Sequence, residues 1–200
     1  MMMRSAKRDT QKGFTIVELL FASTIFSLVL LGAAAGLIQV GRIYYRGVIT
    51  SRTQDVARSV IDDVAQTLQF NAGTVRTSTS GGNTTAFCVG GTRYNVNLDN
   101  QIVSDGDWAL VRDTTSAECT QNDTSSGTEL LGESMRLHAF SVSQIGDSNA
   151  YRIQIRVIYG DDELLDGLDT DNPACRGLRF GGQFCAVSEL NTIVSRRIAN

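Results

Sequence analysis

The sequence predicts an α+β protein in which one long amino-terminal helix packs on an antiparallel β-sheet. Three observations favour this fold class. Residues 14–40 are almost wholly apolar, residues 42–70 carry apolar side chains at helical spacing, and short apolar segments after residue 71 are separated by turn residues. The 200 residues are enough for one domain of ordinary size and an appendage.

Changes in composition divide the chain into four segments. We expect a cytoplasmic leader peptide at 1–13, a transmembrane helix at 14–40 and an amphipathic helix half at 41–70. A β-rich globular head at 71–200 follows and is expected outside the cytoplasm.

The leader and the apolar run together predict a membrane span and its orientation. Residues 1–13 hold four basic side chains and one acid, and the next 27 residues hold a single charge. As a helix rising about 1.5 Å per residue, the run spans roughly 40 Å, more than the roughly 30 Å of bilayer hydrocarbon. Because basic flanks stay in the cytoplasm, the rest of the chain is expected on the other side.

Two simpler interpretations leave one residue unexplained. A secretory signal peptide has an apolar core of about 7–15 residues before a small-residue cleavage site. This run is longer, and the three alanines at 33–35 match such a site only in part. A plain membrane anchor fits the length. Neither explains Glu18, since a carboxylate within an apolar span costs on the order of 2–3 kcal/mol and calls for a partner.

The segment around Glu18 resembles a known processing signal. Residues 13–20 read Gly-Phe-Thr-Ile-Val-Glu-Leu-Leu, and over residues 7–40 the chain resembles the type IV pilin-like proteins. In that family prepilin peptidase cuts after the glycine and methylates the new amino terminus. The resemblance implies cleavage between Gly13 and Phe14, N-methylation of Phe14, and Glu18 as the fifth mature residue. It also implies the pilin fold, with half of the long helix apolar and half packed on a sheet.

Cleavage would supply the charge partner that Glu18 lacks. The new amine at Phe14 is a cation one helical turn before Glu18, whose carboxylate also faces the positive end of the helix dipole. The amine can pair with its own Glu18 or with that of a neighbouring subunit. Because a buried unpaired charge is costly, a growing filament favours the register in which each carboxylate meets an amine. Glu18 is therefore the predicted assembly residue.

The second half of the helix is amphipathic. Its apolar stripe is expected to pack on the sheet of the head. The stripe consists of Val56, Ala57, Val60, Ile61, Val64, Ala65 and Leu68.

Glycines at 32, 36, 41 and 47 lie between the two halves of the helix, and each costs a helix interior about 1 kcal/mol relative to alanine. Gly32 and Gly36 fit a close-packing face between membrane helices. Alternatively, the glycines mark a segment that stretches when the subunit leaves the bilayer.

The head is predicted to be an antiparallel sheet of short strands. Residues 71–85 are rich in Gly, Ser, Thr and Asn, which predicts a loop. The clearest strand is 150–159, where apolar and polar residues alternate, and the turn at 146–149 predicts a hairpin with the strand before it. The predicted strands are 86–89, 94–98, 108–112, 135–145, 150–159 and 192–198.

The cysteine count predicts two disulfides, since an even number outside the cytosol is typical of disulfide bonding. Four cysteines allow three pairings. We prefer Cys88–Cys119 and Cys175–Cys185 because each closes a local loop. The spacings fit no zinc pattern. A carboxy-terminal disulfide loop also resembles the D-region of the pilin family.

The acidic segment 161–172 carries six carboxylates. We expect a solvated loop, with no metal and no cofactor. The alternative hypothesis is a calcium site, because calcium takes oxygen ligands and the segment offers Asp166, Asp169 and Asp171.

Catalysis is not expected. The sequence has no nucleophile elbow, P-loop or paired-histidine metal motif, and its one histidine, His138, is interpreted as structural. The net charge of −3 argues against direct binding of nucleic acid.

The predicted function is that of a structural subunit, a minor pilin or pseudopilin, of a type IV pilus or related secretion filament. Its expected partners are prepilin peptidase and other pilin or pseudopilin subunits. Its expected location is the plasma membrane and then the pilus at the cell surface. Two alternatives stay open: the major pilin of the filament shaft, and a single-pass, membrane-anchored surface binding protein.

Overall fold

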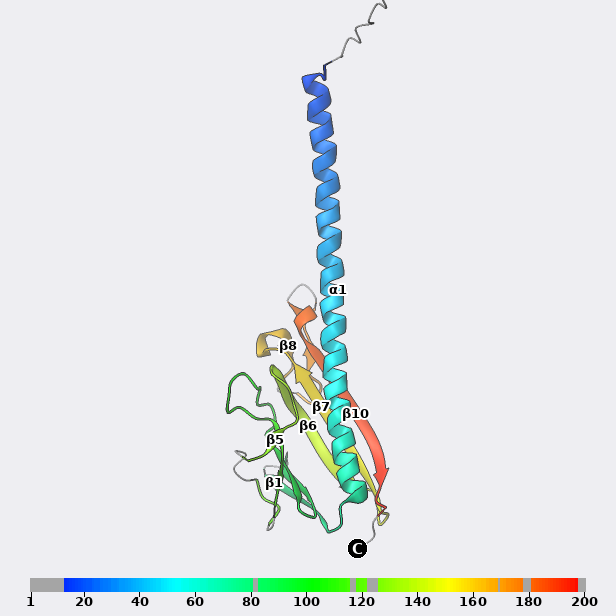
Figure 1. Ribbon diagram of the computed structural model, residues 1–200, viewed down its shortest axis with the longest axis vertical. Helices are drawn as coiled ribbons and strands as arrows, with labels where there is room; N and C mark the ends of the chain where they lie inside the picture. Colours follow the sequence, from blue (N-terminus) through cyan, green and yellow to red (C-terminus); the bar gives the residue numbers. More distant parts are fainter. Residues whose placement is uncertain are drawn as a thin grey trace, which may run out of the picture. The chain divides into compact units, whose positions relative to one another are not determined.

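The computed structural model describes residues 13–80, 83–115, 118–121, 126–168, 170–177 and 181–197. The chain divides into two compact units, Met1–Gly41 and Arg42–Asn200. One helix, α1 (Ile16–Phe70), begins in the first unit and ends in the second, and the strands all follow it (Figure 1). The helix packs against antiparallel sheets, so the prediction of an α+β fold with a long amino-terminal helix is confirmed.

The described strands form three antiparallel sheets. The larger sheet has the order β1-β2-β3-β4-β5, the second β10-β7-β6, and the smallest β8-β9. Their bounds are β1 Val75–Ser80, β2 Asn83–Val89, β3 Thr92–Val96, β4 Leu110–Thr114, β5 Thr128–Glu129, β6 Met135–Gln144, β7 Ala150–Tyr159, β8 Leu165–Asp166, β9 Ala174–Cys175 and β10 Ala186–Ser195. Two described 3-10 turns are η1 (Asp162–Leu164) and η3 (Gly182–Phe184).

The two larger sheets are joined through the connection between β3 and β4. Leu98 forms a bridge with Leu137 of β6, and the Asp99 N–H donates to the Leu137 carbonyl at 2.8 Å. Ile102 continues this contact by donating to the Met135 carbonyl at 3.0 Å. Helix α1 therefore faces one continuous core in the second unit.

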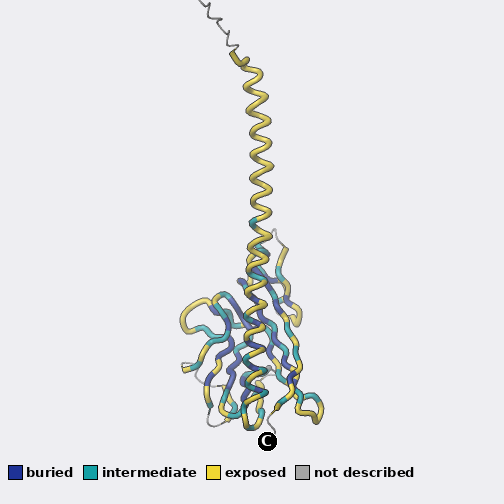
Figure 2. Tube along the Cα trace, turned by 45° about the vertical axis from the view of Figure 1, so that its right-hand side comes forward, coloured by how far each residue is buried: buried dark blue, intermediate teal, exposed yellow. Residues whose placement is uncertain are grey.

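The buried face of α1 consists of side chains three and four residues apart. They are Thr53, Ala57, Val60, Ile61, Val64 and Leu68. Val56 and Ala65 of the predicted stripe are only partly buried. The Thr53 hydroxyl is satisfied within the helix, donating to the Ile49 carbonyl at 2.9 Å. Figure 2 shows, in dark blue along the Cα trace, that buried residues lie in the part of the chain where α1 runs beside the strands. Burying each larger aliphatic side chain contributes about 1.5–3 kcal/mol.

Asp63 fastens α1 to the larger sheet. The Tyr94 hydroxyl of β3 donates to Asp63 Oδ2 at 2.7 Å, and Arg112 of β4 forms an ion pair with the other carboxylate oxygen. Thr67, one turn further along α1, has its hydroxyl 2.8 Å from the Tyr94 hydroxyl. Burial raises the pKa of Tyr94 above its usual range, so the phenol stays protonated and able to donate.

The carboxyl end of α1 is closed by residues that follow the last strand. The last turn of the helix contains no basic residue. Instead, Arg196 donates to the carbonyls of Asn71 at 3.1 Å and Gly73 at 2.7 Å, and the Arg197 guanidinium lies 5.7 Å from the centre of the Phe70 ring. Cations are favourable at this end of a helix because its carbonyls carry partial negative charge.

The prediction of a loop at 71–85 is wrong. Strand β1 occupies Val75–Ser80 and β2 begins at Asn83. The Thr and Val residues of β1 are good strand formers, and pairing with β2 supplies the hydrogen bonds that composition could not indicate.

Other predicted strands differ at their ends. The 150–159 strand is confirmed as β7, whereas the last strand is Ala186–Ser195 rather than 192–198. Its start was missed because its extent is set by pairing along the whole of β7, from Ala186↔Tyr159 to Ser195↔Ala150. The end of the predicted last strand lies outside the described residues. Strand β4 begins two residues later than predicted, at Leu110.

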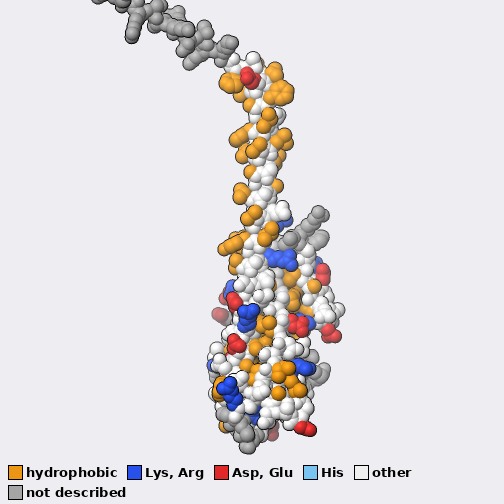
Figure 3. Space-filling model, turned by 90° about the vertical axis from the view of Figure 1, so that its right-hand side faces the viewer, with side chains coloured by type: hydrophobic (Ala, Val, Ile, Leu, Met, Phe, Trp, Pro, Cys, Tyr) orange, Lys and Arg blue, Asp and Glu red, His pale blue; other side chains and the backbone are white. Residues whose placement is uncertain are grey.

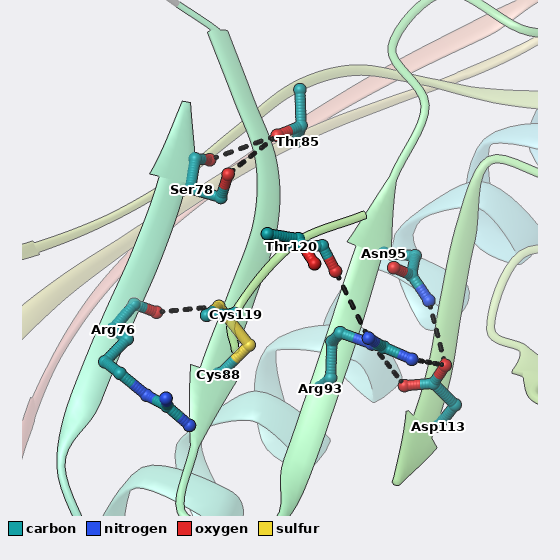
Figure 4. The surroundings of a disulfide bond; sticks show 9 residues. All are labelled: Arg76, Ser78, Thr85, Cys88, Arg93, Asn95, Asp113, Cys119 and Thr120. Carbon is teal, nitrogen blue, oxygen red and sulfur yellow. Dashed lines mark hydrogen bonds and ion pairs between the residues drawn. A yellow bond between two sulfur atoms is a disulfide. The ribbon is translucent and has the colours of Figure 1, made fainter. Parts of the chain in front are cut away.

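A buried ion pair lies on the face of the larger sheet that carries Cys88 (Figure 4). The Arg93 guanidinium donates to both carboxylate oxygens of Asp113, at 2.9 and 2.6 Å, and to the Thr120 carbonyl at 3.2 Å. The two side chains are only 6% and 3% exposed. The Cys88–Cys119 disulfide holds the segment that contains Thr120 against this sheet. The buried pair thus links β3 and β4 to the segment that contains Thr120.

Replacing Asp113 by Ala should destabilise the protein by about 3–5 kcal/mol, because it leaves the Arg93 guanidinium buried without its carboxylate. The matched control is Arg112→Ala, which removes a more exposed ion pair and should cost about 0–1 kcal/mol. Denaturant unfolding of the full chain in mild detergent, followed by tryptophan fluorescence, measures both. Similar losses in the two variants would contradict this assignment.

Candidate functional site

The residues around the predicted cleavage site form the start of α1. Gly13, Phe14 and Thr15 precede the helix, which begins at Ile16. The Thr15 hydroxyl accepts the Glu18 backbone N–H at 3.2 Å, and the Thr15 carbonyl accepts the N–H of Leu19 at 3.1 Å. Thr15 is therefore the N-cap. Thr15 and Glu18 have the spacing of a capping box, in which the cap hydroxyl and the side chain of a glutamate three residues later each accept a backbone N–H. The bond to the cap hydroxyl is the one from the Glu18 N–H.

Glu18 lies in the first turn, where an anion is favourable because the free N–H groups give that end of the helix partial positive charge. Its side chain is exposed, and among the described residues its carboxylate has no hydrogen bond or ion pair. A single chain thus presents this carboxylate at the end of an apolar surface. A cation from a new amino terminus or from another chain can reach it there.

The helix beyond Glu18 presents apolar side chains on all sides, as Figure 3 shows for one face. Its few hydroxyl groups donate to helix carbonyls one turn back: Ser23 to Leu20 and Thr24 to Phe21, both at 2.9 Å. Polar groups bonded in this way need no water. Within the described part of the chain, α1 is the helix long and apolar enough to cross a membrane.

Space around the four helix glycines is open. A Cβ atom built on Gly32, Gly36, Gly41 or Gly47 would meet no other described atom within 4 Å beyond the adjoining helix backbone. No contact within the described chain therefore requires glycine at these positions. Helix α1 runs through all four without a break. Both interpretations of these glycines, close helix packing and stretching, concern other chains or another state of this one.

The comparisons with known proteins bear on this same segment. Residues 8–34 match the family model of the prokaryotic N-terminal methylation motif, a range that contains Gly13, Phe14 and Glu18. No curated protein and no solved structure matches the chain. The chain thus carries a prokaryotic N-terminal methylation motif that leads into a long, exposed apolar helix, an arrangement consistent with a type IV pilin-like protein.

The four cysteines form two disulfides, Cys88–Cys119 and Cys175–Cys185. The first closes a separation of 31 residues over the larger sheet, and the second closes 10 residues that include η3. Within the second loop, a Cβ on Gly182 would lie 1.9 Å from the Arg176 carbonyl oxygen, so the close approach of these backbones requires glycine.

The acidic segment contains η1 and β8, and β8 pairs with β9, which follows the segment. Asp166 pairs with the Arg176 guanidinium at 2.9 Å, and the Asp171 carbonyl accepts a hydrogen bond from Arg156. Asp169, the third calcium candidate, lies outside the described residues. Among those that are described, no cluster of three His, Cys, Asp or Glu side chains is arranged to hold a metal ion.

His138 ties β6 to two other segments. Its Nδ1 lies 2.6 Å from Asp99 Oδ1 and its Nε2 lies 3.1 Å from the Thr170 carbonyl oxygen. Both ring nitrogens thus contact acceptors from distant parts of the chain, as expected of a histidine that holds loops in place. A polar cavity of about 430 Å³ adjoins the ring and is also lined by Gln154 and Arg156.

The capping role of Thr15 was not predicted from the sequence. The signal was present, because a threonine three residues before a glutamate at the start of an apolar run is the pattern of a capping box. Thr15 sets the first residue of the helix and so places Glu18 within the first turn.

Replacing Thr15 by Val should destabilise the first turn of α1 by about 1 kcal/mol, because the Glu18 N–H loses its acceptor. Hydrogen exchange of this amide, measured in micelles, should become faster. The control is Thr24→Val: its hydroxyl donates to a carbonyl that is already within the helix ladder, so little change is expected there. Unchanged exchange at Glu18 would show that Thr15 is not the cap.

Millimolar calcium should leave the melting temperature of the protein unchanged. The reason is that the Asp166 carboxylate is paired with the Arg176 guanidinium. Asp171 accepts the hydrogen bond from Arg156 through its backbone carbonyl rather than through its carboxylate. Differential scanning calorimetry with calcium or with chelator measures this. A rise in melting temperature that disappears in Asp171→Asn would instead establish the calcium site.

Proposed function

We propose that this protein is a structural subunit of a type IV pilus or related secretion filament, in the role of a minor pilin or pseudopilin. The observation that carries the proposal is the methylation motif over residues 8–34, which leads into a capped apolar helix with Glu18 in its first turn. In this proposal the chain is stored in the plasma membrane through residues 14–40 and then enters a filament at the cell surface.

Processing by prepilin peptidase is supported by the backbone at the predicted cut. Gly13 and Phe14 lie outside the helix, so their peptide bond can enter a protease site without unwinding α1. Removal of residues 1–13 turns the Phe14 nitrogen into an amine, which the peptidase then methylates. The cap at Thr15 keeps the first turn formed after the leader is lost.

Assembly follows from charge pairing in apolar surroundings. The mature amine lies next to a helix whose first turn holds an unpaired carboxylate. When apolar helices of neighbouring subunits replace lipid around Glu18, a lone carboxylate remains costly and an amine relieves that cost. Pairing between the amine of one subunit and Glu18 of the next therefore selects one axial register among many that bury equal apolar area.

The rest of the chain is proposed to lie outside the cytoplasm. Basic residues precede the span, and the positive-inside tendency then places the carboxy-terminal part on the far side of the membrane. Two disulfides in this part suit an oxidising compartment. The minor role is part of the proposal, and the abundance of the protein in sheared filaments separates it from the major pilin of the shaft.

Mass spectrometry of the protein from cells with active prepilin peptidase should find Phe14 as the first residue, carrying a methyl group on its amine. Cells without the peptidase should contain the uncut chain. An intact Gly13–Phe14 bond in cells with the enzyme would overturn the proposal and favour the single-pass surface binding protein.

Replacing Glu18 by Gln should leave cleavage intact and reduce incorporation into filaments, because the neutral amide cannot balance the charge of the neighbouring amine. Immunoblots of sheared filaments and of membranes measure the two pools. The control is Glu133→Gln, which removes an exposed carboxylate from the head and should not affect either pool. If the Glu18 variant enters filaments as well as the wild type, charge pairing does not set the register.

A further inference from the structure

Aromatic and basic side chains follow the apolar run of α1. Tyr44 and Tyr45 are 68% and 55% exposed, although both rings are large and mostly apolar. Arg42 and Arg46 are exposed one helical turn apart, so they lie on the same side of the helix. Among the described residues neither arginine has an ion-pair partner.

The loop closed by Cys175–Cys185 adds a third ring to this group. The Phe184 ring lies with its centre 6.1 Å from that of Tyr45 and remains 45% exposed. Its position is fixed by the backbone, since Gly181 adopts a left-handed conformation with φ of 86° and the Phe184 N–H donates to the Gly181 carbonyl at 2.9 Å. Figure 1 shows the end of this loop, in orange, beside α1.

The length of the helix places these residues at a defined depth. Tyr44 lies thirty residues after Phe14, which corresponds to about 45 Å of helix. A bilayer with its headgroups is about 40–45 Å thick. When Phe14 is at the cytoplasmic interface, Tyr44 and Tyr45 reach the opposite headgroup region.

We propose that, before assembly, the interfacial patch formed by Arg42, Tyr44, Tyr45, Arg46 and Phe184 docks on the outer surface of an anionic lipid bilayer. This inference rests on the membrane anchoring that is part of the proposed function. Tyrosine rings lie at the headgroup level, a phenylalanine ring inserts at the boundary with the acyl chains, and the two arginines bind lipid phosphates while their stems stay among the acyl chains. The η3 turn is then held at the membrane by Phe184.

Charges around the patch are compatible with an anionic surface. The acidic turn at 161–163 approaches the loop through Leu164, whose Cδ2 would lie 2.8 Å from a Cβ on Gly181. Two of its carboxylates are engaged elsewhere in the head: Asp161 accepts from Gln101, and Asp162 pairs with Arg136 at 2.5 Å. Glu163, the third carboxylate of this turn, is exposed, and among the described residues neither Arg42 nor Arg46 forms an ion pair with a carboxylate, so both arginines are available to lipid phosphates.

Contact with lipid can be measured from the fluorescence quenching of a tryptophan placed in the patch. The full chain is reconstituted, at less than one copy per vesicle, in phosphatidylethanolamine–phosphatidylglycerol vesicles with brominated acyl chains, which quench nearby indoles. Phe184→Trp should lose fluorescence relative to the same variant in unbrominated vesicles. Ile193→Trp, at a 60% exposed position on β10, is the matched control and should not be quenched. The parent chain corrects for Trp108.

A second reporter and a charge variant make the result decisive. Tyr45→Trp should be quenched like Phe184→Trp, which covers the case in which the loop variant misfolds. Arg42→Gln with Arg46→Gln should reduce the quenching of both reporters, and most strongly in vesicles rich in phosphatidylglycerol.

Equal fluorescence of the Phe184→Trp and Tyr45→Trp variants in brominated and plain vesicles, with the protein resisting alkaline extraction, would overturn the docking and leave the proposed function standing. Quenching of the patch in a chain whose Gly13–Phe14 bond stays intact in cells would support the docking and overturn the filament role. Release of the protein by alkaline extraction would overturn the docking together with the anchoring on which it rests.

Discussion

The contact between the buried stripe of α1 and the two larger sheets is the interaction on which the rest of the head depends. Ala57, Val60, Val64 and Leu68 enter a core shared by strands that are far apart in the sequence. Apolar burial has no preferred direction, so polar contacts fix the register of the helix. Asp63 binds Tyr94 and Arg112 at its side, and Arg196 binds the carbonyls beyond its last turn. The carboxy-terminal half of α1 is thereby held against the head.

The amino-terminal half of α1, by contrast, is not packed against the sheets. Its apolar side chains are exposed in the single chain, and its hydroxyl groups are satisfied by its own backbone. Such a surface is stable only in lipid or against other apolar helices. In the proposed filament, Glu18 would select the axial register, because many axial positions bury equal apolar area but only some place a cation beside a carboxylate. In the proposed function, storage in a membrane and assembly into a filament use the same apolar surface and differ in what covers it.

The acidic segment and the disulfide loops show how tertiary contacts decide the use of local chemistry. Asp166 has the residue type of a calcium ligand, yet its carboxylate is held by Arg176. Asp113 is charged and lies on a strand, yet Arg93 and the segment beside Cys119 bury it. Neither arrangement can be found from periodicity, because the partner residues lie 10 and 20 positions away and meet only through strand pairing.

The long amino-terminal helix, the fold class and the methylation motif could all be predicted from the sequence. These features follow from local patterns: the length of an apolar run, a spacing of three and four, and residues adjacent in the chain. The β1 strand, the full length of β10, the pairing of Arg93 with Asp113 and the contact of Phe184 with Tyr45 were decided by the tertiary structure alone. Each depends on a partner distant in sequence, and its free energy appears only when folding brings the two segments together.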